Sequence, residues 1–537
     1  MEHLELIILL LFGISFLAVL SRRYNFPFPI LLVFVGLIVS FIPGVPLITL
    51  KPEIVFLIFL PPLLYGAAWN TSWHDFKANI RPITLAGVGL VFFTTLLVAA
   101  AAHYFIPQMS WTQAFLLGAI VSPPDAVAAT SITKGLGLNP RIISIIEGES
   151  LVNDASGLIA YKYALAAIVT GSFSLQAAGL QFILVVSGGI AIGFLVGYLM
   201  YLVHSKFICE TVVEVALTLF TPYASYLLAE YFHLSGVLAV VTTGLYLSHR
   251  SDVIFTPESR IEAYAVWDVV VFILNGLIFI LLGLQLKNVL SGISESSPGE
   301  LIFYGLMVSV VVVVVRFVWV IPAALLPRLL SKRIREKEEF DMRNLVVFGW
   351  AGIRGVVSMA AVLAIPLLTK EGTAFPNRNL LIYLTFCVII FTLIVQGLSL
   401  PWIIKKLKIP KHSIAAEEYT VRTEIVSNLI QHIEENLSLV SEDLLNNVKS
   451  KYETRYKRLQ FTEVPLPKMA GTNTPVQNSA LEVFNEFTNV QLDLIKVERD
   501  MIRTLHQSGK VNEEILRKIE RELDMEESRL RLEVYSG

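Results

Sequence analysis

The chain has 537 residues, of which 55% are hydrophobic and 16% charged, and its mean hydropathy is +0.66. A soluble domain carries roughly 25% charged residues, so this composition indicates a membrane protein. The net charge of −2 excludes a basic surface for nucleic acid, and the two cysteines, Cys209 and Cys387, are too few for a disulfide framework or a thiolate metal site.

Apolar runs long enough to cross a bilayer, about 20 residues each, recur along the first 404 residues. The first run follows Glu2 and Glu5 and precedes Arg22 and Arg23, the reverse of a signal peptide, so we expect it to be retained. The expected fold is an all-α polytopic membrane protein with thirteen transmembrane helices. The expected spans are 4–20, 28–44, 53–69, 82–105, 111–133, 141–169, 177–203, 211–232, 235–249, 262–286, 300–326, 344–369 and 379–404.

The connections between these spans differ in charge. Fifteen Lys and Arg residues lie on the side that includes Arg22, Arg23 and the segment 328–343, and four lie on the other side. Cytoplasmic connections of membrane proteins carry the excess of Lys and Arg. We therefore expect the N-terminus outside the cell membrane and the C-terminus in the cytoplasm.

The composition changes at Lys405, because 42 of the 86 Lys, Arg, Asp and Glu residues lie from there onward. We expect a transmembrane domain over 1–404 and a soluble helical cytoplasmic tail over 405–537, with a linker near 465–479. Apolar residues at helical spacing, with Asn512 as a cap, predict amphipathic tail helices. The tail either packs on itself or offers a face to a regulatory ligand, a partner helix or the membrane domain.

Ionisable residues inside the spans are few, and each costs at least ~2.5 kcal/mol on insertion scales, so each is a candidate for function. Lys162 lies two turns beyond Asp154 and is expected to snorkel or to pair with an outer carboxylate. Arg316 is expected to be structural, and Asp268 is left open. The full set is Asp125, Glu147, Glu149, Asp154, Lys162, Asp268, Arg316 and Arg354.

The segment 146–157 places oxygen-bearing side chains on two adjacent lines of one helix. Ser150 and Asp154 are four residues apart, as are Glu149 and Asn153. Hydroxyl, carboxamide and carboxylate oxygens are ligands that hard cations prefer. The pattern predicts a monovalent-cation site at Asp154; the alternative is that Asp154 only ties helices together through hydrogen bonds.

Two spans are interrupted by residues that a helix tolerates poorly, Ser122-Pro-Pro-Asp125 in the fifth and Gly352-Ile-Arg-Gly355 in the twelfth. If spans 1–6 and 8–13 are inverted repeats, the interruptions fall at matching positions, which is typical of a transporter's ion site. Asp125 and Arg354 are then placed to offset the dipoles of the half-helices where these cross.

Arg354 also needs a buried counter-charge, for which Glu149 is the candidate, and this leaves Asp154 as the unpaired titratable group. One such carboxylate per protomer predicts electroneutral exchange of one Na⁺ for one H⁺ by alternating access. Exchange of K⁺ for H⁺, a gated cation channel and a membrane-anchored scaffold are the alternatives. No motif for a metal, a nucleophile or a phosphate is present, so we expect a transporter without cofactors and not an enzyme.

Over roughly residues 5–405 the chain resembles the cation:proton antiporters of the CPA1 type, a group that includes bacterial NhaP-type antiporters and animal sodium/proton exchangers. Glu-Ser-Leu-x-Asn-Asp upstream of Gly-x-Arg-Gly is the most specific combination. The landmarks are Phe59-Leu-Pro-Pro-Leu-Leu64, Ser122-Pro-Pro-Asp-Ala-Val-Ala128, Glu147-Gly-Glu-Ser-Leu-Val-Asn-Asp154, Leu234-Ser-Gly-Val-Leu-Ala239, Leu277-Ile-Phe-Ile-Leu-Leu-Gly283 and Gly349-Trp-Ala-Gly-Ile-Arg-Gly355.

The resemblance implies a homodimer of protomers with thirteen spans, each divided into a dimerisation half and a six-helix core half. By resemblance, Asp154 carries the ion or proton, Asn153 supports it and Ser150 supplies an oxygen. It further implies that Glu149 pairs with Arg354.

Two positions depart from the pattern of many relatives. An acidic residue that follows Phe-Leu-Pro-Pro in them is Gly66 here. A Thr that some relatives carry before the aspartate of the crossing, Asp125 here, is Pro124. Gly66 removes a cation ligand, whereas Pro124 still offers its backbone carbonyl to the ion. The preference for Na⁺ over K⁺ or Li⁺ therefore stays open.

Overall fold

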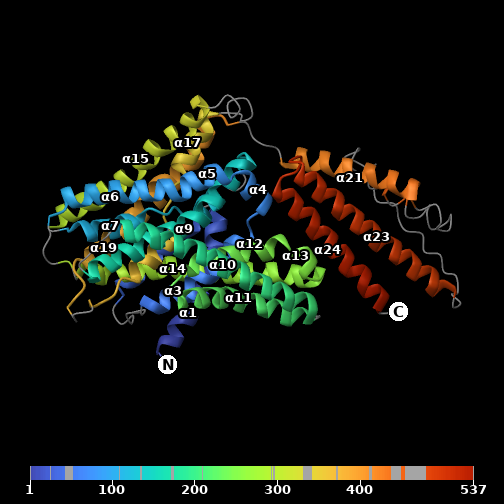
Figure 1. The fold of residues 1–537 in the computed structure, drawn as a ribbon, viewed down its shortest axis with the longest axis horizontal. Coiled ribbons are helices and arrows are strands. Elements are labelled where there is room, and N and C mark those ends of the chain that lie inside the picture. Colours follow the sequence, from blue (N-terminus) through green and yellow to red (C-terminus); the bar gives the residue numbers. More distant parts are fainter. Residues whose placement is uncertain are drawn as a thin grey trace. The chain divides into compact units, whose positions relative to one another are not determined.

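The structure is a computed structural model, and nearly all of its regular elements are helices (Figure 1). Within the described residues the one exception is an isolated β-bridge between Leu368 and Ala374. The expected all-α fold is confirmed. The structure describes residues 2–24, 26–42, 52–107, 109–133, 136–170, 175–207, 210–291, 293, 297–330, 341–369, 373–409, 414–436, 449–450, 452–453 and 479–535.

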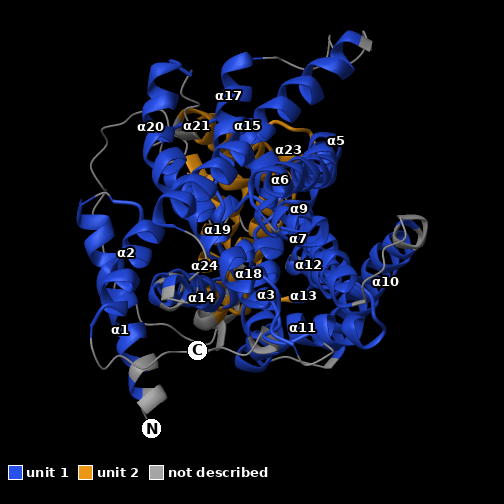
Figure 2. Ribbon diagram, turned by 90° about the vertical axis from the view of Figure 1, so that its left-hand side faces the viewer, with its two compact units in different colours: residues 1–254, 263–411 blue, residues 255–262, 412–537 orange. Residues whose placement is uncertain are grey.

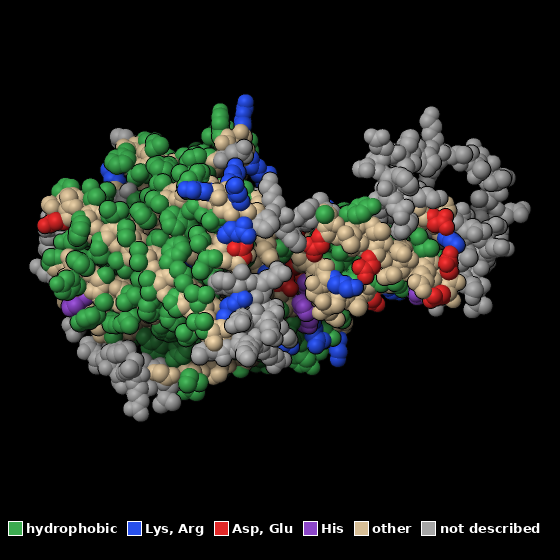
Figure 3. Space-filling view, turned by 90° about the horizontal axis from the view of Figure 1, so that it is seen from above, with side chains coloured by type: hydrophobic (Ala, Val, Ile, Leu, Met, Phe, Trp, Pro, Cys, Tyr) green, Lys and Arg blue, Asp and Glu red, His purple; other side chains and the backbone are tan. Residues whose placement is uncertain are grey.

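The chain forms two compact units, coloured separately in Figure 2. Unit 1 comprises Met1–Ile254 and Ala263–Lys411, and unit 2 comprises Phe255–Glu262 and His412–Gly537. Hydrophobic side chains cover most of the face of unit 1 seen in Figure 3, as a surface in contact with lipid requires.

Seven helical stretches in the described part of the chain are long and apolar enough to cross a membrane. Three shorter apolar helices, Phe28–Ser40, Val55–Trp69 and Gly236–His249, accompany them. The helix over Pro140–Thr170 is 31 residues long, but its internal charges keep it out of that set. A polytopic membrane protein is therefore supported, while the count of thirteen spans and the inverted repeats stay predictions.

In unit 1 the helices form two bundles, and we name the first the core bundle because it packs around α7 and α9. Two of its spans, α7/α8 and α17/α18, are interrupted by non-helical residues. Its members are α5 (Ile80–Thr84), the π-helix η1 (Leu85–Leu90), α6 (Val91–Phe105), α7 (Trp111–Val121), α8 (Ala126–Thr133), α9 (Pro140–Thr170), α15 (Pro298–Leu330), α17 (Met342–Trp350), α18 (Val356–Leu363), α19 (Arg378–Phe391), the π-helix η2 (Thr392–Gln396) and α20 (Gly397–Lys406).

The second bundle, the scaffold bundle, is built on α3, which packs against α11 and α12. Its helix α14 lies against α2, where Phe272 stacks on Phe28, and against α11, where Trp267 donates to Thr218 Oγ1. Its members are α1 (Glu2–Tyr24), α2 (Phe28–Ser40), α3 (Pro52–Trp69), α10 (Leu175–Phe207), α11 (Thr211–Tyr231), α12 (Gly236–His249) and α14 (Pro257–Ser291) from Ala263 onward. The short helices α4 (Trp73–Ala78) and α13 (Ser251–Ile254) connect longer ones.

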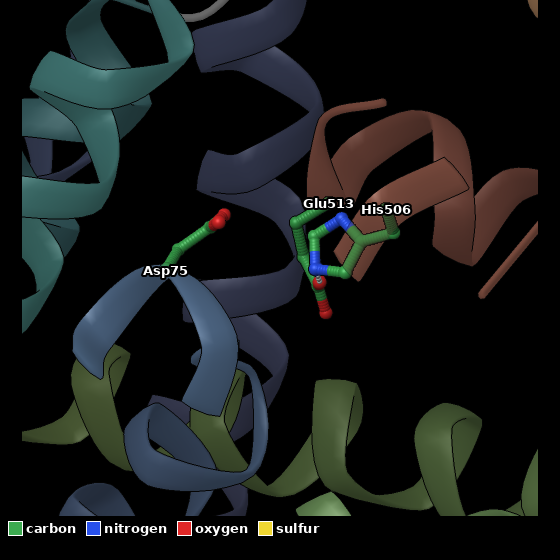
Figure 4. A group of neighbouring side chains, drawn as sticks. All are labelled: Asp75, His506 and Glu513. Atoms are coloured by element: carbon green, nitrogen blue, oxygen red, sulfur yellow. Dashed lines mark ion pairs between the residues drawn. The ribbon is translucent and has the colours of Figure 1, made fainter. Parts of the chain in front are cut away.

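Unit 2 contains α21 (Ile414–Asn436), α23 (Ser479–Gln507) and α24 (Glu513–Tyr535) around a common apolar core. Eight of the apolar positions expected at helical spacing lie in this core or against it: Val490, Leu494, Val497, Met501, Leu505, Ile515, Ile519 and Leu523. Ile515 N donates to Asn512 Oδ1 at 2.9 Å, which confirms the cap. His506 and Glu513, drawn in Figure 4, lie 3.3 Å apart between Nε2 and Oε2. The linker expected near 465–479 lies outside the described residues except for Ser479.

A segment that precedes a membrane span also belongs to unit 2. Arg260, at the start of α14, forms a buried bidentate ion pair with Asp524 of α24, and Arg499 of α23 donates to the same carboxylate at 2.7 Å. From the sequence, Arg260 was predicted only to be one of the fifteen basic residues on one side of the spans. The domain boundary at 404/405 stays a prediction.

Charge pairing in unit 2 generates a pH dependence. Glu527 accepts hydrogen bonds from Arg499 at 2.8 Å and from Arg531 at 2.7 Å. Burial acts to raise the pKa of the Glu527 carboxyl, but the bonds and charges of these arginines outweigh it and hold the pKa below its ordinary value. The pKa of Glu418, which Arg422 and Lys518 contact, is lowered in the same way.

We therefore expect unit 2 to lose stability on acidification. Because the folded-state pKa values lie below the unfolded value of 4.5, this contribution is complete above that value and is lost as the pH falls through the folded values. The protection factors of amides in α23 and α24 of the full chain, which compare the exchange rate with that of an unfolded chain at the same pH, should fall below about pH 4.5. The fall should be smaller in Glu527→Gln, and equal acid sensitivity of the two proteins would contradict the assignment.

Candidate functional site

The two interrupted spans of the core bundle meet at their breaks. The break between α7 and α8 contains Asp125, and the break between α17 and α18 contains Ile353. Asp125 N donates to Ile353 O at 2.7 Å, so backbone groups that the helices leave unpaired satisfy one another. Proline pairs and glycines at these positions explain why neither helix continues through the crossing.

The Asp125 carboxylate lies at the N-terminal ends of two half-helices. Its Oδ1 accepts from Ala128 N of α8 and its Oδ2 from Val356 N of α18, both at 3.2 Å. Helix N-termini carry unpaired N–H groups and a positive partial charge, which a carboxylate offsets. A Cβ at Gly355 would overlap this carboxylate, so only glycine lets the second break approach so closely. The expected role of Asp125 at the crossing agrees with this geometry.

A cavity of about 250 Å³ lies between the core bundle and the scaffold bundle. The core bundle supplies every acidic residue of its lining: Asp125, Glu147 and Asp154. The other lining residues are Leu63, Leu64, Gly66, Ala67, Asn70, Thr71, Pro123, Pro124, Ala126, Val127, Thr130, Ser150, Val271, Asn275, Gly355, Val356 and Val357.

Along α9 the cavity runs from accessible to enclosed. Glu147 is half-buried, and Asn70, in the same lining, is exposed. Asp154, two turns after Glu147 on the same face of α9, is only 7% exposed. The cavity therefore ends at a nearly enclosed carboxylate, with the Ser150 hydroxyl one turn away.

Four of the five residues expected to bind the ion or proton line this cavity: Asp154, Ser150, Asp125 and Pro124. The Ser150 hydroxyl also accepts from Ala126 N of α8 at 3.4 Å, which ties α9 to the first break. The fifth, Asn153, is fully buried and lies outside the lining. Its amide group has no hydrogen-bond partner in the described part of the chain.

The expected ion pair between Glu149 and Arg354 is wrong in this structure, because Glu149 is bound to Arg316 of α15 instead. Arg316 Nη1 and Nη2 donate to the two carboxylate oxygens at 2.6 and 2.9 Å, and both side chains are 1% exposed. Arg316 also donates to Phe348 O at 3.2 Å and lies over the Phe348 ring. The pair thus ties α9, α15 and α17 together inside the core bundle.

Arg354 is fully buried at the second break, within electrostatic range of Glu149 and Arg316. Its backbone N donates to Thr392 Oγ1 of η2 at 3.0 Å. Its guanidinium has no hydrogen-bond partner among the residues that the structure describes. Arg354 therefore acts on Glu149 through its field and not through a direct bond.

Two structural roles were not identified from the sequence. Arg316 was expected to be structural, but not to be the partner of Glu149, and Thr392 was not considered at all. Thr392 and Gln396 are polar residues four positions apart in an apolar span, which is the signal that could have indicated them. Both lie in η2, and a π-turn in a helix often marks a functional site.

The wall of the cavity that faces Asp154 from the scaffold bundle is neutral. Its polar residues are Asn70, Thr71 and Asn275. At Gly66 an added Cβ would lie 2.7 Å from Val271 Cγ2 of α14. Val271 thus occupies the space that a side chain at position 66 would need. The packing of α3 against α14 therefore requires a glycine at this position.

Removing the Arg316 cation should destabilise the core bundle strongly. In Arg316→Gln the Glu149 carboxylate stays buried without its partner, which costs ~3–5 kcal/mol. Arg343→Gln, which breaks the exposed pair with Asp341, is the matched control and should cost only ~0–1 kcal/mol. Thermal unfolding of the purified proteins in detergent measures both, and equal shifts would contradict a structural role for the buried pair.

Comparisons with known proteins agree with the fold. The family model "Sodium/hydrogen exchanger, transmembrane" matches residues 6–406. An uncharacterized Na⁺/H⁺ exchanger of Mycobacterium bovis is 31% identical over 95% of this chain and 93% of its own length. A sodium, potassium, lithium and rubidium/H⁺ antiporter of Bacillus pumilus is 32% identical over 76% of this chain and 62% of its own length.

Among solved structures, the sodium proton antiporter MjNhaP1 of Methanocaldococcus jannaschii matches with a TM-score of 0.58 and 20% identity, over 76% of this chain and 99% of that chain. This likeness shows the fold. The matched family region contains both helix breaks and the whole lining of the cavity. The chain therefore belongs to the sodium/hydrogen exchanger family of transmembrane cation:proton antiporters, as the resemblance of its motifs predicted.

Proposed function

We propose that Asp154 is the site that H⁺ and a monovalent cation, Na⁺ or Li⁺, occupy in turn. The observation that carries this proposal is the nearly enclosed Asp154 carboxylate at the inner end of a cavity between two helical bundles. A proton and a cation compete for such a group, because either one neutralises a charge that low-dielectric surroundings disfavour.

Oxygen atoms around Asp154 suit a hard cation. The Ser150 hydroxyl and the Pro124 carbonyl belong to residues that line the cavity, and Asn153 supports Asp154 from the preceding position of α9. Oxygen ligands of this kind bind hard cations in other proteins. Asp125 contributes its field while its oxygens cap α8 and α18.

The charges around the crossing support a one-for-one exchange. Asp125 and Glu149 are balanced by Arg316 and Arg354, which leaves the charge of Asp154 uncompensated. One H⁺ or one monovalent cation neutralises it. The neutralised core bundle moves against the scaffold bundle, whereas the charged one is held back by the low dielectric, so exchange by alternating access is obligatory and electroneutral.

We further propose a homodimer in the cell membrane, with the N-terminus outside and the C-terminus in the cytoplasm. The excess of Lys and Arg on one side of the spans supports this orientation. Residues 405–537 then form a cytoplasmic domain, and the charged surface of unit 2 is compatible with water. This tail either packs on itself or carries the face that binds a regulatory ligand or partner.

K⁺/H⁺ exchange by the same residues is the second candidate. It is favoured by Gly66, which leaves the scaffold wall without a carboxylate and so reduces the field strength at the site. A relative from Bacillus pumilus is named for sodium, potassium, lithium and rubidium. Ion selectivity therefore needs a direct test.

Asp154→Asn should abolish exchange, because the neutral amide takes up no proton and has no negative charge to attract the cation. Proteoliposomes with an imposed pH gradient and an internal pH dye receive Na⁺, Li⁺, K⁺ or choline. The wild type should dissipate the gradient with Na⁺ or Li⁺, and Asp154→Asn with none of them. Asp493→Asn, at an exposed site in α23, should behave like the wild type. Retained exchange in Asp154→Asn would rule out Asp154 as the carrier.

Electroneutral exchange predicts that the membrane potential does not drive transport. In the same proteoliposomes, net flux should be zero when the concentration ratio of the cation across the membrane equals that of H⁺. This condition should hold at every membrane potential. An exchange of two charges for one would shift this null point by the full potential. A shift with voltage would therefore contradict the one-for-one stoichiometry and leave the role of Asp154 standing.

A further inference from the structure

The interface between the core bundle and the scaffold bundle is open on one side of Asp154. There the cavity is lined by Glu147 of α9 and by Asn70, which directly follows α3. Glu147 lies seven residues before Asp154, about 10 Å along the helix axis. No residue of α9 beyond Asp154 belongs to the described lining. The cavity therefore extends from Asp154 toward the N-terminal end of α9.

On the other side of Asp154 the two bundles are in contact. Tyr161 of α9 lies seven residues after Asp154, again about 10 Å along the axis, and is 2% exposed. Its ring meets Phe56 of α3 edge to face, with 5.8 Å between centroids. Asn70 and Phe56 are at opposite ends of α3, so α3 and α9 run antiparallel across the interface. The open and the closed side of the interface between the bundles therefore lie at different positions along the axes of α3 and α9.

An ion pair crosses the interface next to this aromatic contact. Lys162 Nζ of α9 lies 2.5 Å from Glu230 Oε1 of α11, with side chains 49% and 32% exposed. The same Oε1 accepts from Gly236 N, the first residue of α12, at 3.4 Å. A Cβ at Gly236 would come within 3.1 Å of that oxygen and 2.7 Å of Tyr226 Cδ2. Glu230 is thereby positioned by the scaffold bundle to receive Lys162 from the core bundle.

We propose that Phe56, Tyr161, Lys162 and Glu230 form a gate on the far side of Asp154, closed in this structure, and that the Lys162–Glu230 pair is its latch. The aromatic contact excludes water from the ion site, and the ion pair holds the bundles together at that level. This inference rests on the proposed function, in which the same side of Asp154 must open in the other half of the cycle. In the proposed orientation this is the outer side.

The strength of the latch suits a contact that breaks in every cycle. Partly exposed ion pairs contribute little to stability, and both side chains of the Lys162–Glu230 pair are partly exposed. The Glu149–Arg316 pair, by contrast, is enclosed within the core bundle and does not cross the interface. Loss of the latch should raise the population of the outward-open state by up to about fivefold. It should leave the ligands of the ion site unchanged.

Lys162→Gln and Glu230→Gln test this sidedness. The apparent KM for Na⁺ is measured separately at the outer and inner faces of proteoliposomes with oriented protein. The apparent dissociation constant at one face equals the intrinsic constant divided by the fraction of protein that is open to that face. The outer KM should therefore fall by up to about fivefold. The inner KM should change far less, because the inward-open state already dominates. The exchanged pair Lys162→Glu/Glu230→Lys should restore the wild-type values, and high ionic strength should reduce the difference.

Cross-linking tests the gate directly. Lys162→Cys/Glu230→Cys, in a background with Cys209→Ser and Cys387→Ser, is joined by a short, reducible bifunctional thiol reagent. Exchange should stop when the link forms and return after reduction, because the link holds the interface shut. Each single cysteine variant, treated in the same way, should keep exchanging. The same background without the two new cysteines controls for the reagent.

The gate is overturned if both KM values stay at their wild-type values in the charge variants while exchange continues, or if only the maximal rate falls. Undiminished exchange in the cross-linked protein overturns it as well. These outcomes are distinct from failure of the proposed function, which shows as retained exchange in Asp154→Asn however the latch variants behave.

Discussion

Unpaired backbone groups at two helix breaks inside a membrane-spanning bundle are the constraint on which the site depends. Such groups are costly in a bilayer unless protein satisfies them. Asp125 meets this requirement with three hydrogen bonds, from its backbone N to Ile353 O and from two amides to its carboxylate. Because those oxygens are engaged in joining α8 to α18, Asp125 is suited to holding the crossing. In the proposed mechanism Asp154 is the carboxylate that carries the exchangeable ion.

Burial distinguishes the charge pairs that hold the core bundle from the pair that crosses its boundary. Glu149 and Arg316 are enclosed, doubly hydrogen-bonded and joined to the α17 backbone, so separating them carries a large penalty. Lys162 and Glu230 join two bundles, and both side chains are partly exposed. A bundle tied internally by the first kind of pair and externally by the second is suited to move as one body.

Periodicity and charge in the sequence predicted the apolar spans, both breaks and the face of α9 that carries Ser150 and Asp154, because these are properties of single helices. Ion pairs between helices could not be predicted in this way, because they depend on distances between residues far apart in the sequence. Arg316 and Arg354 both lie in apolar spans, and nothing in the sequence measures how far each is from Glu149. For the same reason the sequence predicted only that Lys162 snorkels or pairs with an outer carboxylate, and it did not identify Glu230 of α11 as the partner. Arg260 belongs to unit 2 because it pairs with Asp524, and the sequence around Arg260 does not indicate this distant partner.

The distribution of acidic groups bears on how an ion would travel. All three carboxylates of the cavity belong to the core bundle, and the scaffold bundle contributes only amides, a hydroxyl and apolar groups. In the proposed mechanism the cation then stays with its ligands on the moving bundle. A carboxylate at position 66 would bind the cation from the scaffold side and link the two bundles through it. Gly66, with Val271 packed against it, removes that link, so selectivity rests on the oxygen geometry around Asp154.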